Sequence, residues 1–587
     1  MLHPSPTYKS YVSYKSHPFQ ARERAPTATR ERRPVMSYRR ETLPDWAKEM
    51  VALYESDAAS QFILHGNIHD RFLLGTTDGT SSGALLDFLK EVLMPQFDVI
   101  LLYDLGNGLR VDRGGEKFKE WPPMQMNAEL PRAPRPAVEL ITRFLRYCAN
   151  LARMNRGKIA VGAMVESAHL VAPAVPGVLN YDLNALALLF REWASSEFFR
   201  GQAIVSCLLT ENLNDLHPIV VNNPRVAKIK IPFPSTQDLE VAITLAREKF
   251  SMALGPFNQY PERLAKGLAG ITMNGLDRLL LVRQYKKEPL GEQDVVEQKR
   301  IIVEEECQGL IEFIAPRRTL NDLYGQEKLK ECLRQDLDLW KVGDLRAIPM
   351  GYLICGPVGT GKTYLVECLA GEAGVPVVKI KNFRDRWVGS TEGNLEKIFR
   401  LLQALDRCYV FVDEADQAFG KRETGGQDAG LSGRIYSMMA AEMSRPENRG
   451  RLVWILASSR PDLIEVDLKR PGRIDLKIPI FPTVSPEEGY RLLSSLAKRY
   501  ELELAPSHED IPVPDLLTPG AAESIMVKVY RLVQTTKAPV MEALKKCLTE
   551  YQSPVLPEVM DAQIRLAIQE TSDMEFIPPK IRERFAR

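Results

Sequence analysis

A glycine-rich segment in the second half of the chain has the residue types and spacing of a phosphate-binding loop. It reads Gly356-Pro-Val-Gly-Thr-Gly361-Lys362-Thr363 and lies between an apolar run and a stretch of helical periodicity. Glycines there let backbone N–H groups turn inward around a phosphate, and the N-terminus of the next helix adds its positive end. Lys362 can reach the β- and γ-phosphates, and the Thr363 hydroxyl can ligate Mg²⁺. The pattern predicts binding of a nucleoside triphosphate with magnesium.

Two adjacent carboxylates follow another apolar run further along the chain. The run at 408–412 predicts a buried strand, and Asp413 and Glu414 come at its carboxyl end, where ligands lie in open α/β sheets. Asp413 is suited to holding Mg²⁺ through its water shell, and Glu414 to orienting and deprotonating a water in line with the γ-phosphate. Together with the glycine-rich loop, this pair predicts Mg²⁺-dependent ATP hydrolysis.

Two arginines flank a Pro-Gly turn in the segment Lys469-Arg470-Pro-Gly-Arg473-Ile-Asp475. By itself such a segment is typical of a surface turn. A planar, permanently charged guanidinium can also stabilise the charge on a transferring phosphoryl group, by a factor of about 10³ to 10⁵ when it acts as a finger. Beside a phosphate loop, Arg470 and Arg473 are therefore candidates for that role.

Residues 320–535 strongly resemble the AAA module of ATPases. The resemblance rests on Tyr324-Gly325-Gln326, the glycine-rich loop, the DEAD segment at 413–416, ASSRPDL at 457–463 and KRPGRID at 469–475. It implies a large α/β subdomain with a small helical lid, assembly into a ring that is usually hexameric, and insertion of Arg470 and Arg473 into a neighbour's ATP site. It also implies that Trp387-Val388-Gly389 forms the loop with which such rings grip a polypeptide, whereas a core or interface role for Trp387 remains the alternative. The residues expected to contact ATP are Tyr324, Gly325, Gly356, Pro357, Val358, Gly359, Thr360, Gly361, Lys362, Thr363 and Tyr364.

One position departs from the family pattern. Where ATNRP usually has an asparagine that positions the attacking water, this chain has Ser459. A shorter hydroxyl only partly replaces such a donor, and losing a preorganised donor can cost on the order of 10²-fold in turnover. The sequence therefore predicts slow basal hydrolysis, with Ser459 as a weakened catalytic residue.

Short apolar runs alternate with helical periods in both halves of the chain. Runs at 61–66, 98–105, 158–165 and 202–209, and again at 351–356, 408–413 and 452–458, read as buried strands, which favours parallel sheets covered by helices on both faces. The predicted fold is α/β, with two tandem AAA-type modules that are each followed by a helical lid. The predicted divisions are a disordered basic tail (1–43), a first α/β module (44–235), a helical lid and linker (236–318), an ATPase module (319–484), and a C-terminal helical lid and tail (485–587).

The two halves contain an internal repeat. Residues 225–235 align with 473–483 without a gap, and Val165-Glu166-Ser167-Ala168-His169 aligns with residues 412–416. The first half has no GxxxxGK[ST] segment, and Ser167 stands opposite Glu414, so it is not expected to hydrolyse ATP. His65 and His69 have the spacing of a zinc pair but lack the adjacent Glu, which favours a polar turn. This arrangement resembles a branch of AAA proteins from bacteria and plastids with a degenerate first module.

The composition is that of a globular protein: of 587 residues, 45% are hydrophobic and 26% are charged. No apolar stretch is long enough for a membrane span, and the absence of a secretory signal favours a cytoplasmic protein, in a bacterial cytosol or a plastid-like compartment. Residues 1–40 carry nine Lys or Arg and two Glu, so the rest is mildly acidic. The tail is interpreted as a solvated leader. The alternatives are a transit peptide, a nucleic-acid arm, or an upstream extension with true initiation at Met36.

These features predict a homo-oligomeric ATPase that remodels a protein substrate or partner, with ATP and Mg²⁺ as cofactors. The alternative is an ATP-gated assembly factor or switch that threads nothing. A nucleic-acid motor is not expected, because the chain beyond residue 40 has a net negative charge and repels a polyanion.

Overall fold

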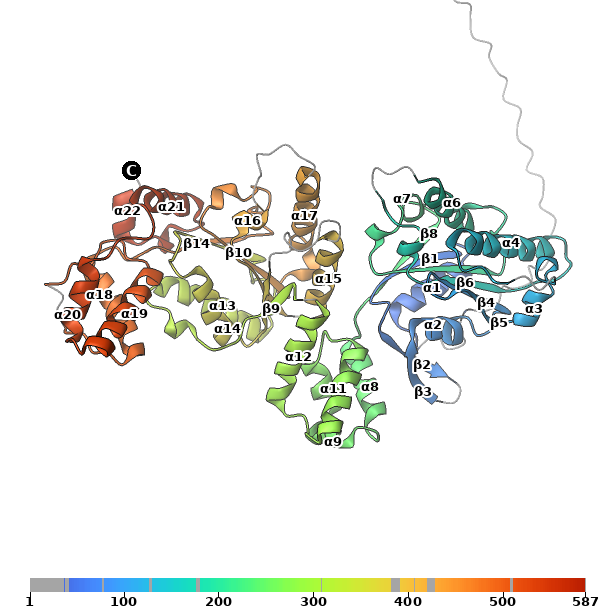
Figure 1. The fold of residues 1–587 in the computed structure, drawn as a ribbon, viewed down its shortest axis with the longest axis horizontal. Coiled ribbons are helices and arrows are strands. Elements are labelled where there is room, and N and C mark those ends of the chain that lie inside the picture. Colours follow the sequence, from blue (N-terminus) through green and yellow to red (C-terminus); the bar gives the residue numbers. More distant parts are fainter. Residues whose placement is uncertain are drawn as a thin grey trace, which may run out of the picture.

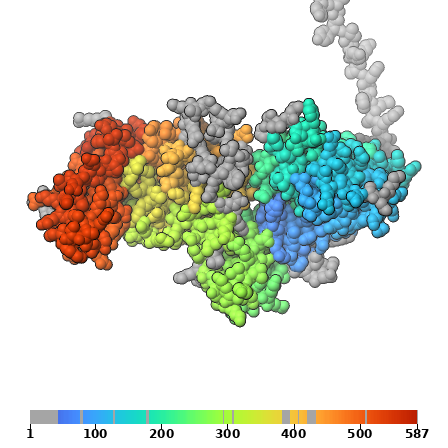
Figure 2. Space-filling view, in the orientation of Figure 1, coloured from blue at the N-terminus to red at the C-terminus, as the bar shows by residue number. Residues whose placement is uncertain are grey.

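The fold is known from a computed structural model, in which two α/β modules are joined by a helical segment and followed by further helices (Figure 1). In the space-filling view the first module and the C-terminal helices lie at opposite ends of the molecule (Figure 2). The structure describes residues 36, 42–76, 79–125, 129–175, 180–307, 309–381, 391–405, 407–419, 428–506 and 510–585. Most of the predicted basic tail, and the predicted loop Trp387-Val388-Gly389, lie outside these residues.

Each module is built on a six-stranded sheet. All strands of each sheet are parallel except one antiparallel edge strand, β5 or β9. The first sheet has the order β5 (Gly108–Arg113), β4 (Val99–Asp104), β6 (Val161–Val165), β7 (Ile204–Thr210), β1 (Gln61–Gly66), β8 (Val226–Ile231). The second has the order β9 (Ile311–Phe313), β11 (Val377–Ile380), β12 (Cys408–Val412), β13 (Leu452–Ser458), β10 (Gly351–Cys355), β14 (Leu476–Pro479).

The two sheets have the same topology. Strands β1, β4, β6, β7 and β8 occupy the places of β10, β11, β12, β13 and β14, and the predicted repeat at 225–235 and 473–483 falls on β8 and β14. The strands carry apolar side chains on both faces; Phe62 and Leu64 enter one core of the first module, for example, and Ile63 enters the other. Two-sided burial explains why these strands read as continuous apolar runs. The shared order supports a duplication of one α/β unit.

The modules differ directly after their first strands. In the second module, β10 runs into the glycine-rich loop and then into α14 (Lys362–Ala373). In the first, β1 is followed by an antiparallel pair, β2 (Arg71–Thr76) and β3 (Gly79–Ala84), and then by α2 (Leu85–Asp87) and a π-helix (Phe88–Leu93). Most of the segment 86–93 is thus π-helical. The remaining helices of the first module are α1 (Asp45–Glu55), α3 (Gly115–Lys119), α4 (Pro134–Arg153), α5 (Ala168–Val171), α6 (Tyr181–Ser195) and α7 (Pro218–Val221).

The helical segment between the sheets shares a core with the second module. Leu239 and Leu279 belong to the same buried cluster as Leu402 and Val410. The segment also contacts the first module, because the buried Asp70 carboxylate accepts the N–H groups of Met273 and Asn274 at the start of α11, at 3.0 Å each. Its helices are α8 (Thr236–Ala246), α9 (Ser251–Leu254), α10 (Pro261–Gly267), α11 (Met273–Lys286) and α12 (Glu292–Glu306). The predicted helical lid and linker, 236–318, also contains a strand, because β9 begins at Ile311.

The helices of the second half begin and end at recognisable signals. Pro486 opens α18 and the Ser485 hydroxyl accepts the Glu488 N–H, while Gly374, with a φ of 64°, ends α14. Among the described residues, none of the helices combines the length and the apolar character needed to cross a bilayer. The helices are α13 (Glu327–Val342), α15 (Thr391–Ala404), α16 (Ala415–Phe419), α17 (Asp428–Met443), α18 (Pro486–Ala497), α19 (Pro519–Thr536), α20 (Val540–Thr549), α21 (Pro557–Glu570) and α22 (Pro579–Phe585).

Helix α15 of the second module contacts the carboxyl edge of the first sheet. Arg400 donates to the carbonyl of Glu211 at 3.1 Å and to the side chain of Asn212 at 3.3 Å, and Asn214 donates to Glu396 at 3.0 Å. Arg400 is also close to His65 at the end of β1. Burial, and next the charges of Arg400, Lys230 and Lys228, lower the pKa of His65 from 6.5 to about 4.

This junction is expected to weaken in acid. His65 is neutral in the folded chain down to about pH 4, whereas in the unfolded chain it takes up a proton near its ordinary pKa of 6.5. Stability is therefore lost as the pH falls from about 6.5 to about 4, by roughly 2 kcal/mol after allowance for solvent screening. Urea unfolding of native protein and of His65→Gln at both pH values measures this loss. The variant should lose less stability on acidification than the native chain, and an equal loss in both would contradict the assignment.

Candidate nucleotide-binding site

A cavity of about 410 Å³ lies between the carboxyl edge of the second sheet and the C-terminal helices. It is lined by the glycine-rich loop, by the segment around Tyr324, by Asp413 and Glu414, and by the start of α19. The fold thus brings together segments as far apart in sequence as Asp322 and Pro578. The predicted residues that line it are Tyr324, Gly325, Val358, Gly359, Thr360, Gly361, Lys362, Thr363, Tyr364, Asp413, Glu414 and Ser459, while Gly356 and Pro357 lie in the preceding turn.

The glycine-rich loop has the backbone that its sequence predicts. Gly359 and Gly361 have φ values of 83° and 88°, which residues with a side chain rarely adopt. A Cβ on Gly356 would lie 2.0 Å from the carbonyl oxygen of Ile480, so this position requires glycine. Lys362 donates to the carbonyls of Gly356 and Pro357 at 2.9 Å each. Burial lowers the pKa of Lys362 to about 8.

The acidic pair lies at the end of β12, beside the start of α14. Asp413 Oδ2 accepts the Thr363 hydroxyl at 3.1 Å and the Lys379 ammonium at 2.9 Å, and Asp413 Oδ1 accepts the Glu414 N–H at 3.1 Å. A carboxylate and a hydroxyl this close are hard oxygen donors of the kind that Mg²⁺ prefers, with waters completing its shell. The residues present therefore fit a magnesium ion.

Glu414 has a strained backbone. Its φ is 48°, in the left-handed region that costs a residue with a side chain on the order of 1 kcal/mol or more. Such strain persists where the surrounding structure fixes it, and it is common at functional sites. Ser167, at the same place in the first sheet, has a φ of 47°. Both modules thus keep the turn, but only the second places a carboxylate on it.

Ser458 is the last residue of β13, Ser459 follows it, and both line the cavity. Ser458 Oγ donates to Asp416 at 2.5 Å and accepts the N–H of Arg460 at 2.9 Å, and this holds the turn after the strand. Ser459 lines the cavity, as expected for the residue at the asparagine position.

The lid contributes contacts that the sequence analysis did not predict. The N–H of Gly520, in the first turn of α19, donates to the carbonyl of Gly359 at 3.0 Å. Arg499 donates to the hydroxyl of Tyr364 at 2.5 Å and lies over its ring. These contacts join residues more than 100 positions apart, and no local motif signals them. They fix the lid directly against the glycine-rich loop.

Arg470 and Arg473 do not line the cavity of their own chain. Arg470 is 68% exposed and pairs with Asp467 at 2.8 Å. Arg473 is 21% exposed and donates to the carbonyl of Asp467 at 2.6 Å, to its carboxylate at 2.9 Å and to Ser444. Arg473 therefore supports the local structure, whereas Arg470 is displayed at the surface.

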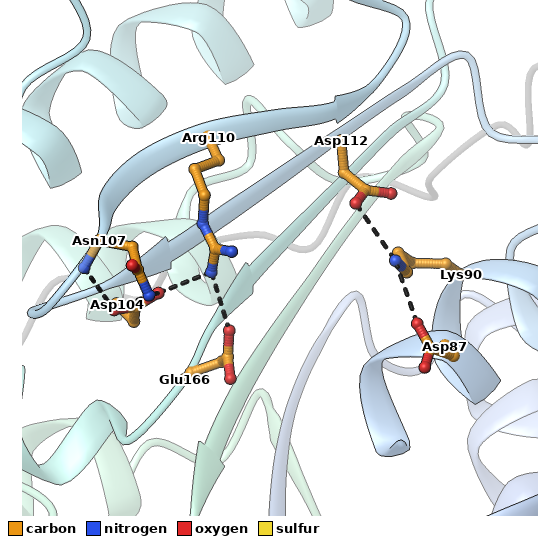
Figure 3. A network of polar contacts seen from close by, with 7 residues as sticks. All are labelled: Asp87, Lys90, Asp104, Asn107, Arg110, Asp112 and Glu166. Atoms are coloured by element: carbon orange, nitrogen blue, oxygen red, sulfur yellow. Dashed lines mark hydrogen bonds and ion pairs between the residues drawn. The ribbon is translucent and has the colours of Figure 1, made fainter. Parts of the chain in front are cut away.

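At the equivalent edge of the first sheet, an arginine pairs with two carboxylates. Arg110 donates to Asp104 at 2.6 Å and to Glu166, the counterpart of Asp413, at 3.2 Å (Figure 3). Nearby, Lys90 bridges Asp87 and Asp112 at 3.3 and 3.2 Å (Figure 3). Burial, and next the charge of Asp104, raise the pKa of Glu166. This carboxylate is therefore engaged within the protein.

His69 pairs with Glu211 at 3.2 Å, and no cluster of three or more potential metal ligands occurs among the described residues. His65 and His69 thus lie in two separate environments. His65 is beside Arg400, and His69 is beside Glu211.

Comparison with known proteins finds a family match in each half of the chain. Residues 28–232 match the family model of the AAA+ chaperone N-terminal Rossmann-like domain, and residues 352–481 match that of the ATPase family associated with various cellular activities (AAA). An ATP-dependent zinc metalloprotease FtsH from Lancefieldella parvula is 33% identical over 174 residues, which are 28% of this chain and 26% of that protein. A putative ribosome biogenesis ATPase nvl from Dictyostelium discoideum is 33% identical over 177 residues, or 29% of this chain and 19% of that protein.

The peroxisomal ATPase pex1 of Schizosaccharomyces pombe matches a longer region, at 27% identity over 310 residues, or 48% of this chain and 32% of that protein. The chain therefore spans about a third or less of the length of these relatives. The first family model spans the strands of the first sheet, and the second spans the phosphate loop, the acidic pair and the strands of the second sheet other than β9. The chain accordingly contains an AAA+ chaperone-type N-terminal Rossmann-like domain followed by an AAA ATPase domain.

Proposed function

We propose that the protein is a Mg²⁺-dependent ATPase whose second module hydrolyses ATP and uses the cycle to remodel protein substrates. The observation that carries this proposal is the single cavity that combines the phosphate loop, the acidic pair, Ser459 and the lid. When bound, Mg²⁺ would neutralise phosphate charge. Each of these parts is a requirement of in-line phosphoryl transfer to water.

Each residue has a role that its position supports. Lys362 leaves the carbonyls of Gly356 and Pro357 and binds the β- and γ-phosphates, and Thr363 and Asp413 hold Mg²⁺. Glu414 takes a proton from the attacking water, and Ser459 positions that water less firmly than an amide would. Tyr324 and Gly325, which line the same cavity, contact the base and sugar.

We further propose that the site is completed by a neighbouring copy in a ring. Arg470 lies outside its own cavity and is exposed, as an arginine directed at a neighbour's γ-phosphate must be. A ring of six copies is the arrangement typical of the family.

The first module serves in docking or recruitment in this proposal and does not hydrolyse ATP. It has a β-hairpin in place of a phosphate loop and helix, Ser167 in place of a catalytic carboxylate, and Glu166 bound to Arg110. The predicted divisions at residues 44–235, 236–318, 319–484 and 485–587 remain part of this proposal, although β9, an edge strand of the second sheet, falls within 236–318.

Replacing Trp387 by alanine tests whether substrates are threaded. If Trp387-Val388-Gly389 grips polypeptide, Trp387→Ala should retain ATPase activity within about twofold but lose processing of an unfolded model substrate by tenfold or more, because an aromatic contact holds the chain. The measurement pairs phosphate release with loss of fluorescence from a tagged reporter protein. Unchanged processing would contradict threading and favour an ATP-gated assembly switch.

A further inference from the structure

The groups proposed to hold Mg²⁺ already face a fixed cation. The ammonium of Lys379 lies 2.9 Å from Asp413 Oδ2, the same oxygen that accepts the Thr363 hydroxyl. We propose that Lys379 is a resident counter-ion of Asp413, which Mg²⁺ must displace, and that Lys379 thereby sets the Mg²⁺ dependence of nucleotide binding. This inference rests on the proposed function of the site.

The fold places Lys379 firmly. It lies in β11, directly opposite Phe411 of β12, and its ammonium lies 5.4 Å from the centre of the Phe411 ring. The side chain is 30% exposed and that of Asp413 is 25% exposed, so the pair is partly shielded from water. Pairing with β12 and stacking on Phe411 therefore direct the charge at Asp413 rather than into solvent.

One carboxylate oxygen cannot contact both the Lys379 ammonium and the water shell of Mg²⁺ equally well. A divalent ion beside an ammonium is repelled, and the repulsion is stronger in a partly shielded site than in bulk water. Lys379 must therefore withdraw when Mg²⁺ arrives. A hollow of about 340 Å³, lined by Lys379, Lys381, Asp413, Glu414 and Gln417, adjoins the pair and gives it room.

In the absence of Mg²⁺, the positive charge of Lys379 favours nucleotide binding. With Lys379 in place, the cleft presents a neutralised Asp413 to the incoming phosphates instead of a bare carboxylate. Nucleotide without Mg²⁺ is therefore repelled less by the native site than by one without this lysine. A purely structural ion pair would stabilise the fold slightly and leave the Mg²⁺ dependence unchanged.

The test compares full-length native protein with Lys379→Met, which keeps the chain length and removes the charge, and with Lys379→Arg, which keeps the charge. Binding of a fluorescent ADP analogue is titrated in EDTA and across a Mg²⁺ series, so that no turnover is involved. Lys381→Met is the matched control. Lys381 lies two residues after Lys379 and pairs with Glu312 at 3.2 Å.

We expect Lys379→Met to reach half-saturation at about tenfold lower Mg²⁺ and to bind several-fold more weakly in EDTA, which corresponds to a modest charge interaction in a shielded site. Lys379→Arg and Lys381→Met should behave like the native protein. Equal Mg²⁺ dependence in native protein and Lys379→Met would overturn the inference while leaving the proposed function intact. Absence of nucleotide binding in the native protein would instead overturn both.

Discussion

Replacing Glu414 by glutamine is expected to lower the ATPase rate by about 10² to 10⁴ while leaving ATP binding intact. Glutamine has the same shape, so it fits the strained turn after β12, where the Glu414 N–H bonds to Asp413. It can still hold the attacking water, but it cannot accept a proton. Loss of the chemical step without loss of binding distinguishes a general base from a residue that only supports the cleft.

Single-turnover phosphate release and fluorescent-nucleotide binding, measured on the same preparation, provide the two readouts. Glu550→Gln, an exposed carboxylate at the end of α20, is a matched control that should leave both unchanged. Hydrolysis by Glu414→Gln at a rate near that of the native protein would remove Glu414 from the proposed role.

Replacing Arg470 by alanine is expected to have a still larger effect, a decrease of about 10³ or more in turnover, because an arginine finger stabilises the charge that develops during transfer. The fold should tolerate the change. Arg470 is 68% exposed, and an exposed pair such as Arg470 with Asp467 contributes about 1 kcal/mol or less. Arg473→Ala is less informative, because Arg473 also binds Ser444 and the Asp467 carbonyl and its loss disturbs the turn itself.

The rate of the native protein should in addition rise more steeply than in proportion to its concentration, because assembly completes the site. Arg470→Ala should stay slow at every concentration. Arg346→Ala is the matched control, since Arg346 is 92% exposed and pairs with Asp344 at 3.2 Å, as Arg470 does with Asp467. An Arg470→Ala protein as active as this control would show that Arg470 is not needed for hydrolysis.

Features encoded in a few consecutive residues could be predicted from the sequence. The glycine-rich loop, the strand ending at Asp413 and the lining position of Ser459 are local patterns, and the structure brings them together in one cavity. The buried central strands could also be predicted, because a strand that is buried on both faces needs a continuous apolar run. The AAA ATPase domain at 352–481 could be predicted from the same motifs.

Features that depend on distant partners could not be predicted. Strand β9 has three residues and exists only because it pairs with β11, more than 60 positions later. Strand β14 carries lysine and proline beside its apolar residues, and it forms through its pairing with β10. Lys379, Arg499 and Gly520 reach the site through strand pairing and lid packing, so their neighbours in sequence carry no signal of their roles.

The central claim is that one cleft, in the second module, is completed by an arginine from another copy. Mixing Arg470→Ala protein with Glu414→Gln protein tests it most directly, because each variant alone is inactive for a different reason. In mixed assemblies, a Glu414→Gln copy can offer its intact Arg470 to a neighbour whose Glu414 is intact. The account predicts that the mixture hydrolyses ATP at least tenfold faster than the sum of the separate variants. A mixture no faster than that sum, with co-assembly of the two variants demonstrated, would contradict it.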